Sequence, residues 1–393
     1  PLYSSAASDV YKRQRSKITV LRGDLGAPNA GLSPEDMITA SKDLDLLVHC
    51  AGLVDFVPPL DKALSGNVDG TLACIEIARR AGPGRCAFIH VSTCFVCGLK
   101  PGVHAEDLDA REFPNRQRAS FEGFDAAIEL EHARRIVSRI KTEESLDPRV
   151  QAEMWDEADG SQRKAKRMAE TRVKRRLVEA GIERANAWGW PNTYTYTKAL
   201  AERLVDAAQG LGPKAIVRPA VVESALRYPF PGWNQGINTS APLVWMNANG
   251  TRYWPTHDDF FLDVIPVDLV CNALVTIGAA ALDHSPARPL KQVYQLGTSD
   301  KNPFAMRRVV ELASLVYSKK PDAAAGMMGA FMRRHFEGIA VSQRTYDAIG
   351  IPAVRKVVDG VRGLLDRIPT PTRPKLAALL GIAVQIGRGP VHA

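Results

Sequence analysis

Long apolar runs, a cysteine framework and a strong charge of one sign are all missing from this sequence. The two most apolar windows, Leu269–Leu282 and Leu376–Ile386, are shorter than the roughly 18 residues of a bilayer-spanning helix, so an integral membrane protein is not expected. The six cysteines have no regular spacing, and a chain of 393 residues does not need disulfides, which favours a reducing, cytoplasmic setting. A net charge of +8 is modest for this length and does not indicate a nucleic-acid partner.

The composition is that of a folded globular protein, with 45% hydrophobic and 24% charged residues. This excludes a disordered or fibrous chain, and the length favours two domains or one large domain with an addition. The start of the chain is unusual. Ser4–Gln14 has no apolar periodicity and resembles a translated sequencing adapter, so we predict that residues 1–16 form a non-native, disordered leader.

Apolar strands alternate with helices along the first half of the chain. Strands are predicted at Lys17–Leu21, Leu44–Cys50, Cys86–Thr93 and Lys214–Val222, and helices at a start near Ser33, at Leu64–Ala81 and at Tyr194–Gln209. Apolar strands that do not alternate with polar residues are typical of a parallel sheet covered by helices on both faces. The sequence therefore predicts an α/β fold with a Rossmann-like, doubly wound parallel sheet.

The remaining segments divide this sheet and follow it. Residues 101–190 have helical spacing and many charges, which indicates a helical insertion within a dinucleotide-binding domain at 17–228. Residues 229–300 are expected to complete this domain as substrate-binding segments. They contain a predicted helix at Leu269–Leu282 and a strand at Gln292–Leu296, and residues 301–393 are predicted to be mostly helical.

Tyr194 and Lys198 stand four residues apart at the start of a predicted helix, which places both side chains on one face. A nearby ammonium would stabilise the phenolate, and moving a tyrosine pKa from about 10 toward 7 is worth about 4 kcal/mol. A tyrosine with a lowered pKa is a competent proton donor at neutral pH. The spacing alone is weak evidence, because the end of an amphipathic helix with a surface lysine has the same pattern.

Two further polar residues belong to the same prediction. Thr93 ends a predicted strand, where the carboxyl edge of a parallel sheet forms a ligand crevice, and its hydroxyl could bind the same substrate oxygen as Tyr194. Asn67 lies on a helix of the same sheet. Each of the two also has a purely structural interpretation, in which its side chain satisfies a local backbone group.

The order of these segments resembles the extended short-chain dehydrogenase/reductase family and, within it, the fatty acyl-CoA reductases, also called male-sterility-type NAD-binding proteins. Nine matching pieces span most of the chain in the order of that family. They are Gly23–Leu25, Gly31–Ser33, His49–Phe56, Asn67–Thr71, His90–Thr93, Pro191–Leu200, Val217–Pro219, Pro231–Trp233 and Asp263–Asp268.

The resemblance implies reduction of long-chain fatty acyl-CoA, or of an acyl group on acyl carrier protein, to aldehyde or alcohol with NADPH. Its implied catalytic residues are Thr93, Tyr194 and Lys198, with Asn67 in support. Its implied cofactor-binding residues are Asp24, Leu25, Ala51, Gly52, Val91, Tyr194, Lys198, Pro219 and Val221. A carrier-protein thioester reductase domain and a non-catalytic dinucleotide-binding scaffold remain alternatives. An epimerase or hydroxysteroid-type dehydrogenase is disfavoured by the long segment between Thr93 and Tyr194.

One departure from the family pattern concerns the cofactor. The glycine-rich G-x-x-G-x-x-G turn, which lets the backbone approach a pyrophosphate, is expected well before Lys17 and is not found there. The first strand–helix–strand unit is expected to be missing with it. We therefore expect this truncated chain to be inactive although its parent is an enzyme, and the preference for NADPH is implied by the resemblance only.

A basic segment at Ser161–Gly181 has eight Lys or Arg residues against two Glu. One hypothesis is that it attracts the phosphates of CoA, an acyl carrier protein or an anionic lipid, which leaves a peripheral membrane contact open. The alternative is a solvated charged helix. Cys94 and Cys97 form a single C-x-x-C pair without a second one, so no metal site is expected.

Overall fold

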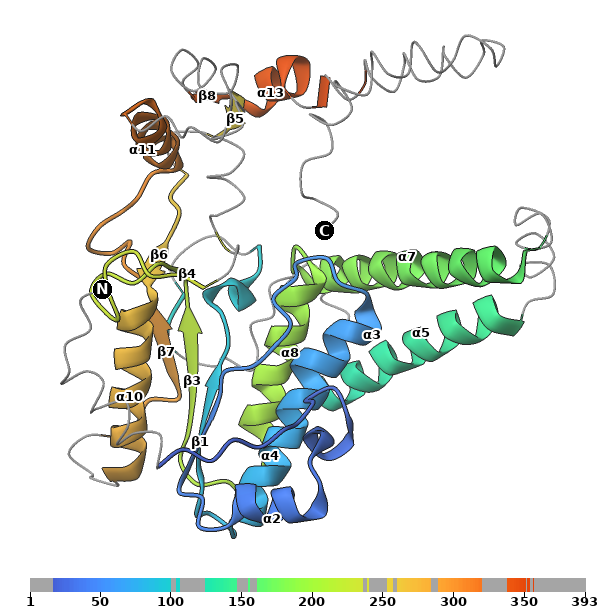
Figure 1. Cartoon of the computed structure of the whole chain (residues 1–393), viewed down its shortest axis with the longest axis vertical. Helices are drawn as coiled ribbons and strands as arrows, with labels where there is room; N and C mark the ends of the chain where they lie inside the picture. Colours follow the sequence, from blue (N-terminus) through green and yellow to red (C-terminus); the bar gives the residue numbers. More distant parts are fainter. Residues whose placement is uncertain are drawn as a thin grey trace. The chain divides into compact units, whose positions relative to one another are not determined.

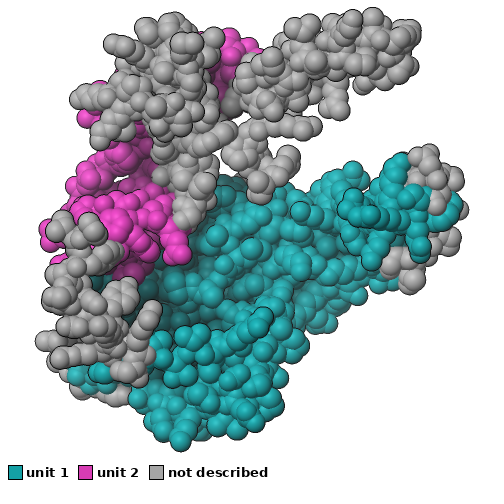
Figure 2. Space-filling model, in the orientation of Figure 1, with its two compact units in different colours: residues 1–219, 272–296 teal, residues 220–271, 297–393 magenta. Residues whose placement is uncertain are grey.

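The structure is a computed structural model of the chain (Figure 1). It describes residues 17–99, 104–106, 124–146, 155, 161–235, 239, 253–256, 260–283, 289–319, 338–350, 352–353 and 356. The predicted leader at 1–16 lies outside these residues. The described residues form two compact units, which are coloured separately in Figure 2: those up to 219 together with those between 272 and 296, and those between 220 and 271 together with those from 297 on.

A four-stranded parallel sheet forms the centre of the first unit. Its strands follow the order β1 (Leu46–His49), β2 (Ala87–Val91), β3 (Lys214–Pro219) and β7 (Val293–Leu296). This confirms the predicted α/β class with a parallel sheet. The strands are apolar on both faces because helices cover both, as crossover connections require.

One face of the sheet is covered by α4 (Gly70–Arg80) and α8 (Thr193–Ala207), whose side chains pack on Phe88 and Ile216. The other face packs against α10 (Val267–Asp283), where Ile277 contacts Ile89 and Val217. Shorter helices precede these elements at η1 (Pro28–Gly31), α2 (Pro34–Ser41), α3 (Leu60–Ala63) and η2 (Leu64–Asp69), and η3 (Cys94–Cys97) follows β2. The start of α2 is fixed by Ser33, whose hydroxyl accepts the backbone N–H of Asp36 as the sequence predicted.

The described part of the predicted helical insertion is a pair of long helices, α5 (Ala126–Leu146) and α7 (Gln162–Trp188), which run side by side (Figure 1). Helix α7 begins at the N-cap Ser161 and ends at Gly189, whose φ of 90° is in the left-handed region that glycine tolerates. The two helices also pack against α8, so the insertion borders the helix that carries the predicted catalytic residues.

The second unit contains two short parallel strand pairs, β4 (Val221–Glu223) with β6 (Val264–Pro266) and β5 (Tyr253–Pro255) with β8 (Ile339–Val341). Its further helices are α11 (Met306–Lys319) and α13 (Gln343–Ile349). The Asp268 carboxylate accepts the backbone N–H groups of Leu226, Arg227 and Tyr228 and so fixes the loop that follows β4. Within the described residues, no helix has both the length and the apolar character needed to cross a bilayer.

Three expectations about elements and boundaries need correction. Lys17–Leu21 is not a strand: it forms no ladder with any described strand, and Ile18 and Val20 are exposed. The predicted strand Lys214–Val222 is two strands, because the chain leaves the central sheet after Pro219 and β4 pairs with β6 instead. The third concerns the connection between the units: they divide at 219/220, and residues 272–296 belong to the first unit because β7 pairs with β3, while the domain boundary at 228/229 stays a prediction.

Candidate active site at the carboxyl edge of the sheet

The candidate active site lies where β2 ends and α8 begins. Thr93 follows β2 by two residues and is buried, as the N-cap of η3. Helix α8 starts at the N-cap Asn192, whose side chain accepts the N–H of Thr195, and this places Tyr194 and Lys198 one turn apart at its beginning. Residues that are 101 positions apart in the sequence thus meet at one edge of the sheet.

The Thr93 side chain lies near enough to the Tyr194 phenol to influence its pKa. Burial raises that pKa, and the interaction with Thr93 opposes the shift. The ring of Phe56 meets the Tyr194 ring edge-on, with the ring centroids 5.9 Å apart. The structure therefore brings together the two hydroxyl groups that the sequence assigned to one substrate oxygen.

Lys198 is only 5% exposed, and its Nζ donates a hydrogen bond to the Val91 carbonyl at 2.8 Å. Burial lowers the pKa of this ammonium from 10.5 to about 8. The sequence predicted that Lys198 lowers the pKa of Tyr194, whereas burial dominates at that phenol and its pKa is raised. The Lys198 ammonium hydrogen-bonds the Val91 carbonyl at the end of β2 and is not among the groups that shift the Tyr194 pKa.

Asn67 connects the loop after β1 to the start of α8. Its Oδ1 accepts the Leu53 N–H at 2.7 Å, and its Nδ2 donates to the Leu53 carbonyl and to Thr197 Oγ1. The residue lies in the π-helical turn η2, and such turns often occur at functional sites. Because Thr197 precedes Lys198, Asn67 positions the helix turn that carries the lysine.

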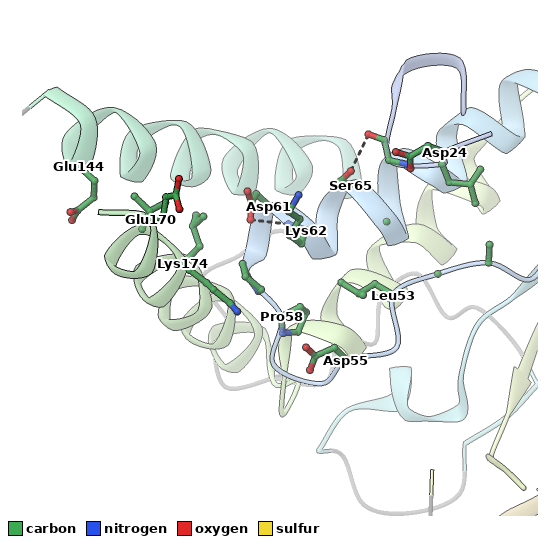
Figure 3. Close-up of a pocket in the computed structure, with 18 of the residues that line it drawn as sticks. Asp24, Leu53, Asp55, Pro58, Asp61, Lys62, Ser65, Glu144, Glu170 and Lys174 are labelled. Carbon is green, nitrogen blue, oxygen red and sulfur yellow. Dashed lines mark hydrogen bonds between the residues drawn. The ribbon is translucent and has the colours of Figure 1, made fainter. Parts of the chain in front are cut away.

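Four predicted cofactor residues, Asp24, Leu25, Ala51 and Gly52, line one cavity of about 1160 Å³ in the first unit (Figure 3). A Cβ added at Gly52 would lie 2.9 Å from Asn67 Oδ1 and 3.5 Å from Lys198 Nζ, so only glycine leaves this passage open. The cavity has the size and mixed lining of a nucleotide site, and it reaches from Asp24 to the neighbourhood of Lys198. These residues therefore fit the adenosine part of a dinucleotide.

Three other predicted cofactor residues do not line this cavity. Val91 contributes its carbonyl to Lys198, and Pro219 ends β3 beside Leu296 of β7. Val221 is on β4, which belongs to the second unit.

A chain of hydrogen bonds that was not predicted from the sequence runs from Cys74 through His49 and Thr71 to Asn67. The Thr71 hydroxyl donates to the Asn67 carbonyl at 2.7 Å, so it must accept from His49 Nε2, which is 3.0 Å away. This leaves His49 Nδ1 free to accept the Cys74 thiol at 3.5 Å. Burial lowers the pKa of His49 to about 4, so the ring is neutral at pH 7.

His90 stands beside His49, with the ring centroids 5.2 Å apart. It is fully buried, its pKa is held well below 6.5 by burial, and neither ring nitrogen has a hydrogen-bond partner among the described residues. His90 is therefore neutral at pH 7, as His49 is. The usable signal in the sequence was a histidine near the end of each of two adjacent predicted strands.

The basic segment on α7 divides into two groups. Arg172 and Arg176 pair with the buried Glu144, at 3.0 and 2.6 Å, and so bind α7 to α5. Lys166 and Lys174 instead line the cavity that contains Asp24 and Gly52. Part of the positive charge therefore has a structural role, which the sequence did not separate from the rest.

The parallel sheet, the Tyr194–Lys198 turn and the Thr93 hydroxyl define an NAD(P)-binding α/β protein of the short-chain dehydrogenase/reductase type. The sequence model of the NAD-binding family described as "Male sterility protein" matches residues 2–274. The chain belongs to this family.

Curated relatives agree with this assignment. The chain is 28% identical over 331 residues to "Probable fatty acyl-CoA reductase 4" of Arabidopsis thaliana and 28% identical over 324 residues to "Alcohol-forming fatty acyl-CoA reductase" of Simmondsia chinensis. The alignments cover 84% and 81% of this chain but 59% of each relative, so the chain spans less than two thirds of their length. Among solved structures, the terminal R domain from the myxalamid PKS-NRPS biosynthetic pathway is similar at 21% identity, with a TM-score of 0.47 over 86% of this chain and 71% of that one.

Proposed function

We propose that the full-length protein containing this chain reduces long-chain fatty acyl-CoA thioesters to fatty aldehyde or alcohol with NADPH. The observation that carries the proposal is that Thr93 and Tyr194 lie together at the carboxyl edge of the sheet, with the buried Lys198 one helical turn from Tyr194. Membership of the male sterility protein family and the curated relatives, which are named as fatty acyl-CoA reductases, support the choice of substrate.

In this proposal the two hydroxyl groups act on the thioester carbonyl oxygen. Tyr194 donates its phenolic proton to that oxygen, and Thr93 stabilises the developing negative charge by a second hydrogen bond. When bound, the nicotinamide supplies the hydride that adds to the carbonyl carbon. The carbon–sulfur bond of the resulting hemithioacetal then breaks, CoA leaves as the thiol, and the aldehyde remains; a second hydride and proton give the alcohol.

Lys198 and Asn67 prepare the site for this step. In this proposal the Lys198 ammonium binds a ribose hydroxyl of the cofactor. Asn67 fixes the start of α8 and the loop at Gly52 relative to each other through Leu53 and Thr197. We place the reaction in a reducing, cytoplasmic compartment, in keeping with six cysteines that are all free thiols.

The test is NADPH oxidation, followed at 340 nm with purified full-length protein and palmitoyl-CoA. We expect turnover that stops when the thioester is omitted, with stoichiometric release of CoA measured by a thiol reagent. Palmitoyl-acyl carrier protein serves as a second substrate, and faster turnover with it would favour the carrier-protein alternative. Binding of NADPH without its oxidation in the presence of either substrate would contradict the proposal and favour a non-catalytic scaffold.

A further inference from the structure

The cavity beside the candidate active site joins three segments that are far apart in the sequence. The loop at Asp24, the loop that follows β1 and helix α7 all contribute to its lining (Figure 3). Leu53, Pro58 and Leu177 supply apolar surface that suits a flat purine base. The insertion helix thus reaches the end of the site predicted to hold adenosine.

Three lysines line this cavity, Lys62 from α3 and Lys166 and Lys174 from α7. Among the described residues, none of these three ammonium groups has a hydrogen-bond or ion-pair partner. Lys166 and Lys174 are two turns apart on α7, about 12 Å along its axis. In Figure 3 the Lys174 side chain extends from α7 toward the loop that carries Pro58. The cavity therefore presents several cations without partners to a ligand.

Two of the five carboxylates in the lining, Asp61 and Glu144, pair with cations. Asp61 pairs with Lys141 at 2.6 Å, and Glu144 pairs with Arg172 and Arg176, whereas none of these three cations lines the cavity. Asp24 and Asp55 accept backbone N–H groups from Gly26 and Val57. Glu170, which lies between Lys166 and Lys174 on α7, is the lining carboxylate that reduces their positive potential most directly.

We propose that this cavity binds the phosphorylated ribose of an adenine nucleotide, with Lys166 and Lys174, assisted by Lys62, as the ligands of the phosphate ester. The inference rests on the proposed function, because both nucleotides of that reaction carry this group: NADPH has a phosphate on the 2′-oxygen of its adenosine and CoA on the 3′-oxygen. Lysine ammonium groups bind phosphate as point charges, and Asp24 with the apolar walls binds the base and ribose. The insertion helix would then determine nucleotide selectivity.

The experiment measures the affinity of the full-length protein for two matched pairs of nucleotides, NADPH with NADH and CoA with dephospho-CoA. Titration calorimetry is carried out on the wild type and on the Lys166→Gln/Lys174→Gln variant. We expect the phosphorylated member of one pair to bind about tenfold more weakly to the variant, with its unphosphorylated partner unchanged. A loss within the NADPH pair identifies the cofactor as the ligand, and a loss within the CoA pair identifies the substrate.

Two control variants separate local charge from a general effect. Arg167→Gln removes an exposed positive charge of α7 that does not line the cavity and should leave all four affinities unchanged. Glu170→Gln should strengthen binding of the phosphorylated nucleotide about threefold, because it removes the intervening negative charge. All of these side chains are exposed, so circular dichroism is expected to show folded protein for every variant.

The possible failures can be told apart. Equal affinities of wild type and double variant for all four nucleotides, with binding intact, would overturn the phosphate site and leave the reductase proposal standing. Equal weakening by Arg167→Gln and by the double variant would also overturn it, because the effect would then be one of net charge. Absence of binding by all four nucleotides would contradict the reductase proposal itself and this inference with it.

Discussion

A lysine at the edge of the sheet and an arginine in the helical insertion have pKa shifts in opposite directions. Lys198, at the edge, is hydrogen-bonded to the neutral Val91 carbonyl, and burial lowers its pKa to about 8. Arg184, in the insertion, makes two hydrogen bonds to the buried carboxylate of Glu129, and these bonds raise its pKa. The first arrangement keeps a cation close to losing its proton, and the second fixes a permanent charge pair.

This difference separates function from stability within one unit. A buried ammonium without a direct carboxylate partner costs folding free energy, and such a cost is typical of a group retained for its chemistry. Glu129 also accepts the Tyr196 hydroxyl at 2.5 Å, so α8 itself is attached to α5 by the residue two positions after Tyr194. Tyr194 thus belongs to the candidate active site, whereas Tyr196, on the same helical turn, binds α8 to the insertion.

The largest expected effect is that of Tyr194→Phe on turnover. Removing the proton donor should lower kcat of the full-length protein by about 100- to 10,000-fold, as measured by NADPH oxidation with palmitoyl-CoA. The matched control is Tyr196→Phe, which removes a hydroxyl that contacts Glu129 and not the site. It should change kcat by less than about twofold and lower the free energy of unfolding by about 1–2 kcal/mol. Similar losses of kcat in both variants would contradict the separation of the two regions.

The next effect is on stability and has opposite signs in the two regions. Arg184→Met leaves the Glu129 carboxylate buried without its cation and should lower the free energy of unfolding by about 3 kcal/mol. Lys198→Met removes a desolvated ammonium and should raise it by about 1 kcal/mol while abolishing activity. Urea unfolding of the purified variants, followed by circular dichroism, measures both. A loss of stability in Lys198→Met as large as that in Arg184→Met would show that Lys198 is a structural residue.

The pH dependence sharpens the same comparison. Because the pKa of Lys198 is lowered from 10.5 to about 8 on folding, the unfolded chain binds more protons between these values, and stability should rise with pH in that window. Activity should change in the other direction: kcat/KM should fall as pH rises through about 8, when the ammonium is lost. The stability slope should disappear in Lys198→Met, and a wild-type kcat/KM that is constant from pH 7 to 9 would rule out the proposed role of the ammonium.

The smallest expected effect concerns the exposed arginine next to a buried ion pair. Arg175 pairs with Glu179 at 3.8 Å on the surface of α7, with both side chains mostly exposed, so Arg175→Gln should change stability by less than about 0.5 kcal/mol. Arg176→Gln, one residue further, should cost several times more because Glu144 is buried. Differential scanning calorimetry of the two variants tests whether burial of the carboxylate decides the outcome.

The sequence predicted the elements whose signals are local. The cap at Ser33, the strand ending before Thr93 and the helix that carries Tyr194 and Lys198 follow from residue order, and the structure has all three. Lys17–Leu21 has the composition of a strand but no ladder in the structure, because composition does not supply a pairing neighbour. Likewise, nothing local marks the point after Pro219 where the chain changes sheets.

The candidate site shows the same limit. Residue types and spacing predicted that Thr93 and Tyr194 would share a site, and the structure has the two side chains near each other. Neither the raised pKa of Tyr194 nor the chain from Cys74 through His49 to Thr71 could be predicted, since both depend on burial and on side-chain packing across elements. The separation of α7 into paired arginines and cavity lysines depends on where Glu144 lies, which the sequence does not show.

The most direct test of the reductase account is transfer of deuterium from the cofactor. The full-length protein is incubated with palmitoyl-CoA and NADPH deuterated at the transferable C4 position, and the lipid products are analysed by mass spectrometry. The account predicts aldehyde with one deuterium at C1 or alcohol with two, and at least about 100-fold less of this labelled product from the Tyr194→Phe variant in the same time. Release of palmitic acid without deuterium, at the same rate with and without NADPH, would contradict it.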